Sequence, residues 1–411
     1  MKRDLDAIMQ ANDIDVLLVV GPAQHNPAMV YMTGGGHLTN ADLIKKRGET
    51  AVLFHGAMER DEAAKTGLVT RGYNLYPYKE LLEEAKGDRI QAAAIRYCRM
   101  FEDLGIKSGR VVLYGQAELS TAYPIFTELQ RRLPEITLTG DPEGKILGTA
   151  MLTKDEQEIE RIRKMGRITT EVVGKVAEYL TSQKVGEDET LVLPDGKPVT
   201  IGHVKGLINL WLAERGAENP EGTIFAIGRD AGVPHSSGNP DDVIRLGQPI
   251  VFDIFPCEEG GGYFYDFTRT WCLGYAPDAV QGLYDQVLTV YNTVVGEMEV
   301  GRHFGDYQRL TCEMFEEMNH PTVLNTPETE EGYVHSLGHG LGMRVHERPF
   351  SGFGASPEDK LLPGSVVTVE PGLYYPSRGM GVRIEDTVWV RPDGKMEILA
   401  EFPKDLVLKM K

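Results

Sequence analysis

The sequence has few cysteines and no long hydrophobic run. Its four cysteines in 411 residues include no Cys-x-x-Cys pair, which excludes a disulfide framework and is typical of a reducing compartment. No segment approaches the roughly 18 uncharged apolar residues of a transmembrane helix. The N-terminal apolar stretch is short and interrupted by acidic residues, unlike a signal peptide. We therefore expect a cytoplasmic protein that does not enter a membrane.

The chain is also poor in positive charge. It has 43 lysines and arginines against 61 aspartates and glutamates, a net charge of −18, which disfavours binding to nucleic acid or to an anionic membrane. The acid excess can serve solubility, or some of the carboxylates can be metal ligands. Hydrophobic residues make up 41% and charged residues 25% of the chain, the composition of an ordinary folded protein. At roughly 150 residues per domain, the length predicts two or three domains.

Residues 1–150 alternate between strand-like and helix-like segments. The predicted strands are Val16–Val20, Thr50–Phe54, Arg110–Leu113 and Thr137–Gly140, and the predicted helices include Arg89–Leu104 and Thr121–Leu133. Such alternation is typical of an α/β domain. The segment contains no phosphate-binding loop and no obvious nucleophile, so we expect the chemistry to lie further along the chain.

A second domain is predicted over residues 151–411. Thr153 and Glu156 have the spacing of the N-cap and N3 residues of a capping box. Apolar residues then recur at steps of three and four over 159–180, which predicts one long amphipathic helix. Strand–turn–strand units follow at 249–273 and 365–390. The pattern predicts an α+β domain with antiparallel hairpins.

The first hairpin carries two aspartates in apolar strands. A turn centred on Glu259–Gly260 would place Asp253 and Asp266 directly opposite each other, with their Cβ atoms about 4.5–5.5 Å apart. Two such aspartates repel each other, and each carries a cost of desolvation. A cation should therefore lie between them, or one of them should be protonated.

The second hairpin repeats this arrangement with glutamates. A turn centred on Ser377–Arg378 would oppose Glu370 and Glu385, with Arg383 on the same face as Glu385 by the period-two rule. Each acid alone could face solvent on an edge strand. Two hairpins with the same pattern favour four carboxylates that converge on cations.

Histidines cluster between the two hairpins. His335, His339 and His346 lie in a glycine-rich stretch, where backbone can approach a ligand closely. His235 precedes the first hairpin in a turn-rich loop and would be unremarkable alone. One imidazole with four carboxylates suits a pair of divalent ions such as manganese, cobalt, iron or zinc. A hydroxide bridging two such ions is a strong nucleophile near neutral pH, so the residues indicate two-metal hydrolysis.

Together these residues resemble the pita-bread metallopeptidases, which include methionine aminopeptidase, aminopeptidase P, prolidase and, without metal, creatinase. The ligands of that family occur in the order Asp, Asp, His, Glu, Glu. The matching positions are Asp253, Asp266 in Asp-Phe-Thr-Arg-Thr, His339 in Gly-His-Gly-Leu-Gly, Glu370 in Val-Glu-Pro-Gly, and Glu385 in Arg-Ile-Glu-Asp. The N-terminal region, with Tyr31-Met-Thr-Gly34, looks like the creatinase, prolidase and aminopeptidase P branch.

The resemblance implies a fold and a set of roles. It implies a C-terminal pita-bread catalytic domain at 151–411 and a smaller N-terminal creatinase-type α/β domain at 1–150, which narrows the pocket in a homodimer. It also implies that Glu370 is both ligand and general base. The other implied roles are stabilisation of the oxyanion, or positioning of the scissile region, by His235 and His346, and orientation of the ligand carboxylates by Arg383. Thr268 lies two residues past Asp266 on the same strand face, so its hydroxyl is either a support for a ligand or a plain strand hydroxyl.

The implied substrate is a peptide with proline at its second position, cleaved at the bond before proline with two divalent ions. Manganese is the first expectation, and cobalt, zinc or iron are alternatives. The resemblance leaves open whether the enzyme is a dipeptidase or an aminopeptidase. A creatinase-like hydrolase of a small non-peptide molecule and a non-catalytic binding module on the same fold are the competing readings, and both are disfavoured by the intact ligand set.

Several positions near the expected pocket depart from the family pattern. The first hairpin is two residues longer than usual between its aspartates, an even insertion that preserves the face of each side chain. The sequence before His235 differs from the family's usual one, residues 184–204 look like an inserted hairpin, and Ser336 stands where relatives often have glycine. These departures affect substrate identity more than metal binding.

Overall fold

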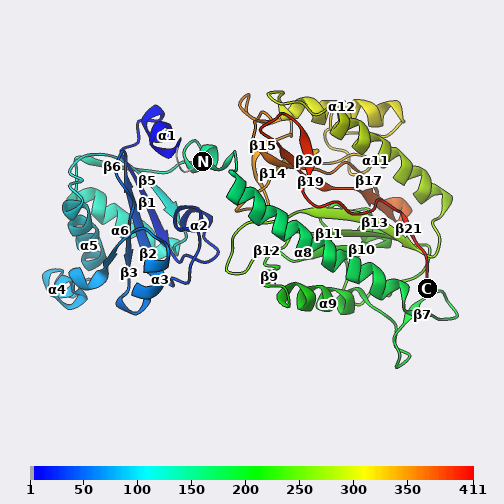
Figure 1. Ribbon diagram of the computed structural model, residues 1–411, viewed down its shortest axis with the longest axis horizontal. Coiled ribbons are helices and arrows are strands. Elements are labelled where there is room, and N and C mark those ends of the chain that lie inside the picture. Colours follow the sequence, from blue (N-terminus) through cyan, green and yellow to red (C-terminus); the bar gives the residue numbers. More distant parts are fainter. Residues whose placement is uncertain (1–3) are drawn as a thin grey trace. The chain divides into compact units, whose positions relative to one another are not determined.

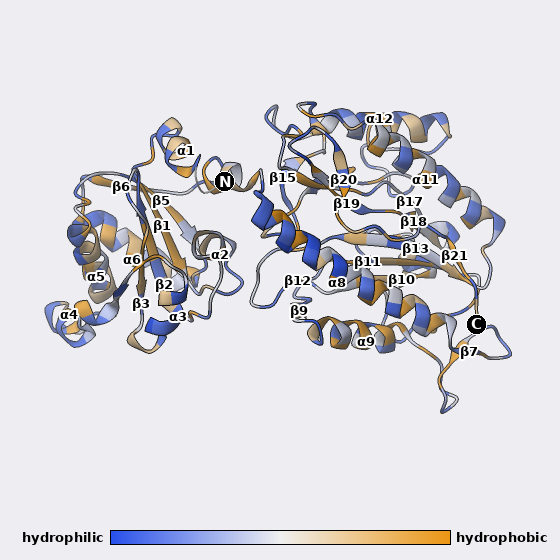
Figure 2. Cartoon of the chain, in the orientation of Figure 1, coloured by the Kyte–Doolittle hydropathy of each residue, from blue (hydrophilic) through white to orange (hydrophobic). Residues whose placement is uncertain are grey.

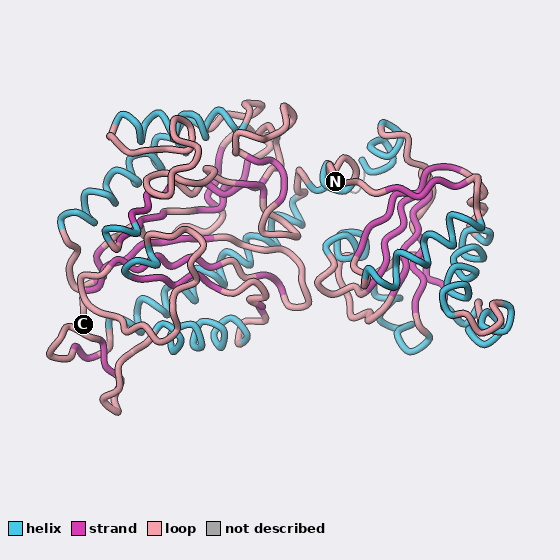
Figure 3. Tube along the Cα trace, turned by 180° about the vertical axis from the view of Figure 1, so that it is seen from behind, coloured by secondary structure: helices cyan, strands magenta, loops and turns pink. Residues whose placement is uncertain are grey.

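The computed structural model describes residues 4–411, and the chain divides into two units (Figure 1). One unit comprises Met1–Met151 with Gly260–Gly262, and the other comprises Leu152–Glu259 with Tyr263–Lys411. In each unit the strands lie at the centre and most helices lie outside them (Figure 3). Among the described residues, no helix has both the length and the apolar character needed to cross a membrane.

The first unit is built on a six-stranded mixed sheet in the order β4-β3-β2-β1-β5-β6. Its strands are β1 (Val16–Gly21), β2 (Ala41–Lys46), β3 (Val52–His55), β4 (Val69–Gly72), β5 (Gly109–Gly115) and β6 (Ile136–Thr139). Its α-helices are α1 (Leu5–Ala11), α2 (Pro27–Thr33), α3 (Arg60–Lys65), α4 (Tyr78–Glu84), α5 (Arg89–Asp103), α6 (Leu119–Arg132) and α7 (Leu147–Met151).

The two faces of this sheet bury separate hydrophobic cores. Leu17 and Val19 of β1 belong to a core with residues of α1, α2 and α7, whereas Val16 and Leu18 belong to a core with residues of α4, α5 and α6. Alternate residues of one strand therefore face opposite helical layers, as the period of two requires. The predicted α/β architecture is confirmed. The antiparallel strand β2, which pairs with β1, was not predicted.

The second unit contains two larger sheets. One has the order β10-β11-β13-β21 and the other β15-β14-β16-β19-β20, with the small pairs β17-β18, β12-β9 and β7-β8 beside them. The strands before the second sheet are β7 (Lys184–Val185), β8 (Leu191–Val192), β9 (Ala217–Glu218), β10 (Thr223–Ile227), β11 (Pro249–Ile254), β12 (Cys257–Glu258) and β13 (Phe267–Leu273). The later strands are β14 (His339–Gly340), β15 (Glu347–Phe350), β16 (Val366–Val369), β17 (Gly372–Tyr375), β18 (Met380–Arg383), β19 (Asp386–Val390), β20 (Met396–Ile398) and β21 (Val407–Leu408).

Four long helices cover these sheets. α8 contacts α9 and β13, while α11 contacts β17 and β18 and α12 contacts β15. Figure 2 shows that the strands are largely hydrophobic, whereas α8 alternates between hydrophobic and hydrophilic positions. The helices are α8 (Glu156–Thr181), α9 (Ile201–Ala213), the short α10 (Gly228–Ala231), α11 (Asp278–Glu297) and α12 (Phe304–Glu317). The predicted α+β class of this unit is therefore confirmed.

The long helix starts two residues later than predicted. The capping box is formed by Asp155 and Glu158 rather than by Thr153 and Glu156. The backbone N–H of Lys154 donates instead to the carbonyl of Gly364, which ties this segment to another part of the unit. The apolar stripe over 159–180 is buried as predicted.

A buried arginine joins the two larger sheets. Arg269 on β13 is fully buried, and its guanidinium donates to the carbonyl of Glu385 at 2.8 Å and to the carboxylate of Asp386 at 2.8 Å. It also donates to the carbonyls of Thr268, Phe402 and Pro403. Because every donor of a buried arginine needs a partner, these bonds fix the chain around Glu385 against β13.

Candidate metal centre

The first hairpin holds two aspartates on one face, but they are not directly opposed. Asp253 pairs with Thr268 across β11 and β13, so Asp266 lies one step diagonally along the same face. The predicted pairing of Asp253 with Asp266 is therefore wrong. The turn is centred one residue later than predicted because Gly260 and Gly261 have φ values of +81° and +79°, the positive values that a type I′ turn requires at both central positions.

The second hairpin has the predicted register with an interruption. Val369 pairs with Asp386 and Gly372 pairs with Arg383, so Glu370 and Glu385 occupy matching positions between two paired stretches. They do not pair with each other there. Pro371 cannot donate to a ladder, and the backbone N–H of Glu385 donates instead to the carbonyl of Thr268 at 3.1 Å. This interruption separates the pairing of β16 with β19 from the pairing of β17 with β18.

The glycines on either side of His339 allow the backbone there to approach β15 and β16 closely. A Cβ at Gly338 would lie 2.1 Å from the carbonyl oxygen of Thr368, and one at Gly340 would lie 2.0 Å from that of Arg348. His339 Nδ1 lies 3.1 Å from the carbonyl oxygen of Gly340. A proton on Nδ1 would donate to that oxygen and leave the lone pair of Nε2 free to bind an ion.

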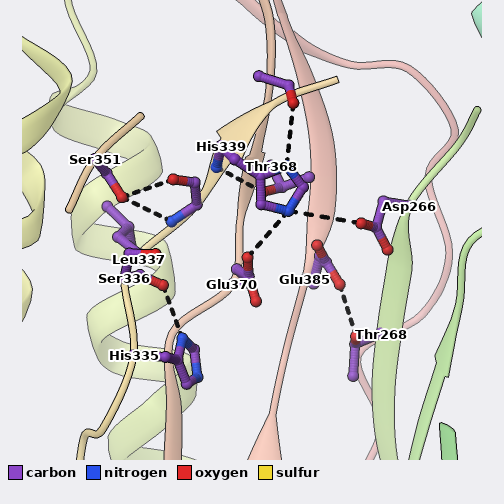
Figure 4. A network of polar contacts seen from close by, with 12 residues as sticks. Asp266, Thr268, His335, Ser336, Leu337, His339, Ser351, Thr368, Glu370 and Glu385 are labelled. Carbon is purple, nitrogen blue, oxygen red and sulfur yellow. Dashed lines mark hydrogen bonds and ion pairs between the residues drawn. The ribbon is translucent and has the colours of Figure 1, made fainter. Parts of the chain in front are cut away.

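His339 Nε2 points into a group of carboxylates (Figure 4). It lies 3.8 Å from Asp266 Oδ2 and 3.4 Å from Glu370 Oε1. Ligand atoms of Asp266, His339 and Glu385 all lie within 4.8 Å of one another. Thr268 Oγ1 donates to Glu385 Oε2 at 2.6 Å and holds that carboxylate in place.

These side chains line one cavity of the second unit, with a volume of about 750 Å³. Every residue with a predicted metal-binding or catalytic role borders it. They are His235, Asp253, Asp266, His339, His346, Glu370, Arg383 and Glu385. Asp266 and Glu385 are buried, with exposed fractions of 4% and 2%, whereas His235 and His346 are exposed.

Burial changes the protonation of this cluster. It raises the pKa of Glu370 to about 8, and it raises the pKa values of Asp266 and Glu385 well above their usual range, with their carboxylate neighbours adding to the shift. Burial also lowers the pKa of His339 to about 3. Without a cation, burial and like charge therefore favour the protonated forms of Asp266, Glu370 and Glu385, and His339 is neutral.

Arg383 fixes one of the carboxylates. Its guanidinium pairs with Asp253 Oδ2 and donates to Tyr374 Oη at 2.7 Å and to Thr268 Oγ1 at 3.2 Å. Among the predicted ligands, only Asp253 is bound directly by Arg383.

Sequence reasoning missed two polar partners of this network. Tyr374 Oη bonds both Arg383 and His335, whose Nε2 lies 2.9 Å away. Tyr374 is four residues after Glu370, so the period of two could have placed it on the same face. His335 was noted in the histidine cluster but received no role, and its contact with Tyr374 spans 39 residues of chain.

The donor set fits divalent ions. Asp253 Oδ1 and Asp266 Oδ1 are buried and have no hydrogen-bond partner among the described residues. A buried carboxylate oxygen without a donor is costly, and an ion would satisfy it. Oxygen atoms with one imidazole nitrogen are ligands that zinc, manganese and iron accept.

Known proteins resemble this chain along most of its length. The model of metallopeptidase family M24 matches residues 160–392. An Xaa-Pro dipeptidase of Pyrococcus horikoshii is 25% identical over 393 residues, which cover 95% of this chain and 94% of that protein.

Solved structures show the same fold. An X-Pro aminopeptidase of Thermotoga maritima superposes with a TM-score of 0.73 at 23% identity, covering 96% of this chain and 97% of that one. An Xaa-Pro dipeptidase of Bacillus anthracis gives a TM-score of 0.73 at 22% identity, covering 99% and 97%. The fold is therefore the pita-bread fold with its N-terminal domain. The predicted metal ligands of this chain line one cavity. Since the family model also covers more than half of the chain, the protein belongs to metallopeptidase family M24.

Proposed function

We propose that this chain is a two-metal peptidase that hydrolyses the bond before proline. The observation that carries the proposal is the convergence of four carboxylates and His339 on one cavity, in which two buried carboxylate oxygens have no donor among residues 4–411. The names of the relatives support the proline preference, because an Xaa-Pro dipeptidase matches nearly the whole chain.

Five residues would hold the ions. They are Asp253, Asp266, His339, Glu370 and Glu385. Two divalent ions, with manganese as our first candidate, would activate a water and polarise the scissile carbonyl. Four carboxylates balance the four positive charges of the pair, which removes the repulsion that the metal-free cluster relieves by binding protons.

The protein's own side chains would move the proton and position the substrate. Glu370 is the proposed general base, because its carboxylate lies in the cavity beside His339. His346 lies next to His339, with 4.3 Å between ring centroids. His346 and His235 are placed to donate to the oxygen that gains charge.

Arg383 and Thr268 would position the carboxylates. Arg383 bonds Asp253, and Thr268 bonds Glu385. These charge-assisted and short hydrogen bonds would keep the two acids oriented when substrate enters.

The remaining parts of the proposal rest on the family resemblance. They are a homodimer, a pocket narrowed by the partner's N-terminal domain, and a cytoplasmic location. A metal-free creatinase-like reaction is disfavoured, because it would provide no ion to bind the buried oxygens of Asp253 and Asp266 that have no donor among the described residues.

The test is hydrolysis by manganese-loaded and metal-stripped protein. The substrates are an Xaa-Pro dipeptide, the same sequence extended by several residues, and a matched peptide with alanine in place of proline. We expect metal-dependent cleavage of at least one proline peptide and little cleavage of the alanine control. Cleavage of the dipeptide alone identifies a dipeptidase, and cleavage of the longer peptide identifies an aminopeptidase. Failure to cleave either proline peptide, with metal bound, would refute the proposed substrate.

A further inference from the structure

An acidic side chain outside the metal cluster lines the same cavity. Glu221 follows β9 and precedes β10, and it borders the cavity together with the metal-type residues. Glu221 is exposed, and within residues 4–411 its carboxylate has no hydrogen bond or ion pair. Its carboxylate is therefore a charge at the wall of the pocket that no hydrogen bond or ion pair of the described residues engages.

The position of Glu221 relative to the cluster follows from the strand register. Ile224 on β10 pairs with Asp253 on β11. Glu221 is three residues earlier in the chain, a separation of at most about 11 Å. The exposed carboxylate of Glu221 thus borders the same cavity as the buried acids, and a long substrate side chain that leaves a peptide bound at the cluster can extend toward it.

His346 borders the same cavity as Glu221. Apolar side chains border the cavity as well. They are Ile224, Pro234, Phe255, Val345 and Phe350.

We propose that Glu221 selects peptides whose residue before the scissile bond has a positively charged side chain, lysine or arginine. The inference rests on the proposed function. The apolar wall would pack against the methylene stem of such a side chain, while the charged head meets the carboxylate. The aromatic rings at the wall add a favourable surface for a cation.

The other charged groups of a peptide fit this position poorly. The α-ammonium is separated from the scissile carbonyl by a single carbon, so it stays beside the metal-type residues. The ammonium of lysine stands at the end of a flexible four-carbon stem and can extend toward Glu221. A C-terminal carboxylate would be repelled by Glu221 and would have to leave in another direction.

The experiment compares two substrates of equal length. Lys-Pro and norleucine-Pro, each as a dipeptide and as an extended peptide, are given to manganese-loaded wild type, Glu221→Gln and Glu313→Gln. Glu313 is an exposed acid on α12 that does not border the cavity, so its variant matches the change in charge. We expect wild type and Glu313→Gln to prefer lysine in kcat/KM by about fivefold, the upper range of an exposed ion pair. Glu221→Gln should lose that preference, and added salt should weaken it in wild type.

Three results are distinguishable. An equal kcat/KM for lysine and norleucine in wild type, or a preference that survives in Glu221→Gln, overturns the inference while leaving the peptidase in place. A loss of activity in Glu221→Gln that is equal for both substrates also overturns it, since it would mean that Glu221 acts only through His346. No cleavage of norleucine-Pro or Lys-Pro by wild type refutes the proposed function itself.

Discussion

Each unit buries carboxylates, but their surroundings differ. In the first unit, Asp42 on β2 is 3% exposed, and its two oxygens accept hydrogen bonds from Tyr73 and Tyr97 at 2.7 Å each. In the second unit, Asp253 and Asp266 are also buried, yet each keeps one oxygen with no donor among the described residues. Burial alone therefore does not indicate function. A buried acid with complete protein partners supports the fold, whereas one with an unpartnered oxygen fits an added ion.

The largest expected effect is at the unpartnered acids. Replacing Asp266 with asparagine keeps the volume and removes a charge that would bind the ions. We expect loss of bound metal and a fall in kcat of more than about 100-fold, beyond the effect of losing an indirect metal contact. Metal content and peptide hydrolysis would both be measured. Retention of metal and activity would mean that Asp266 is structural, as Asp42 is.

The next effect is at Thr268, which holds another proposed ligand, Glu385. Thr268→Val removes the hydroxyl that bonds Glu385 and keeps the shape of the side chain. We expect a loss of about 10–100-fold in metal affinity or activity. Thr268→Ser retains the hydroxyl and should restore most of the loss. If valine and serine behave alike, the hydroxyl has no part in holding the ligand.

At Asp42 the comparison predicts a loss of stability only. Tyr97→Phe leaves one buried oxygen of Asp42 without its donor, which costs about 1–3 kcal/mol. Denaturant unfolding should show this decrease in the free energy of unfolding. Metal content and kcat should stay at wild-type values. A loss of metal from this variant would remove the contrast between the two groups of acids.

A further expected effect is a dependence of stability on pH in metal-free protein. Burial raises the pKa of Glu370 from its usual value of 4.5 to about 8, so between these values the folded state binds a proton that the unfolded state has released. The free energy of unfolding should therefore decrease as pH rises from about 4.5 to 8. Adding manganese should reverse this decrease, because the bound form needs the ionised acid. Unfolding curves at a series of pH values, with and without manganese, test this. A metal-free protein that becomes more stable over that range would contradict the assignment.

Much of the candidate site follows from local sequence rules. Alternation along the strands is enough to place Glu370 and Glu385 at matching positions, because the turn over 376–379 has the predicted centre. The same rule predicted the wrong cross-strand partner for Asp253, because the turn before Asp266 is centred one residue later than predicted. Five neighbouring positions, two glutamates and three glycines, offer several turn centres, and the backbone conformation of Gly260 and Gly261 decides among them.

Long-range contacts could not be predicted in the same way. Arg269 contacts Asp386 across 117 residues, and Lys154 donates to Gly364 and thereby moves the start of α8. Glu221 lies in a loop that has no periodicity to place it on a face. These features depend on how the two sheets pack, which no local pattern in one sequence specifies.

The most direct test of the account is a count of bound metal. Metal-stripped wild type would be titrated with manganese and compared with the double variant Asp253→Asn/Glu385→Gln, with Tyr97→Phe as the control. We predict two ions per chain in wild type and in the control, and a loss of binding in the double variant. Binding that is unchanged in the double variant, or absent from folded wild type, would contradict the account.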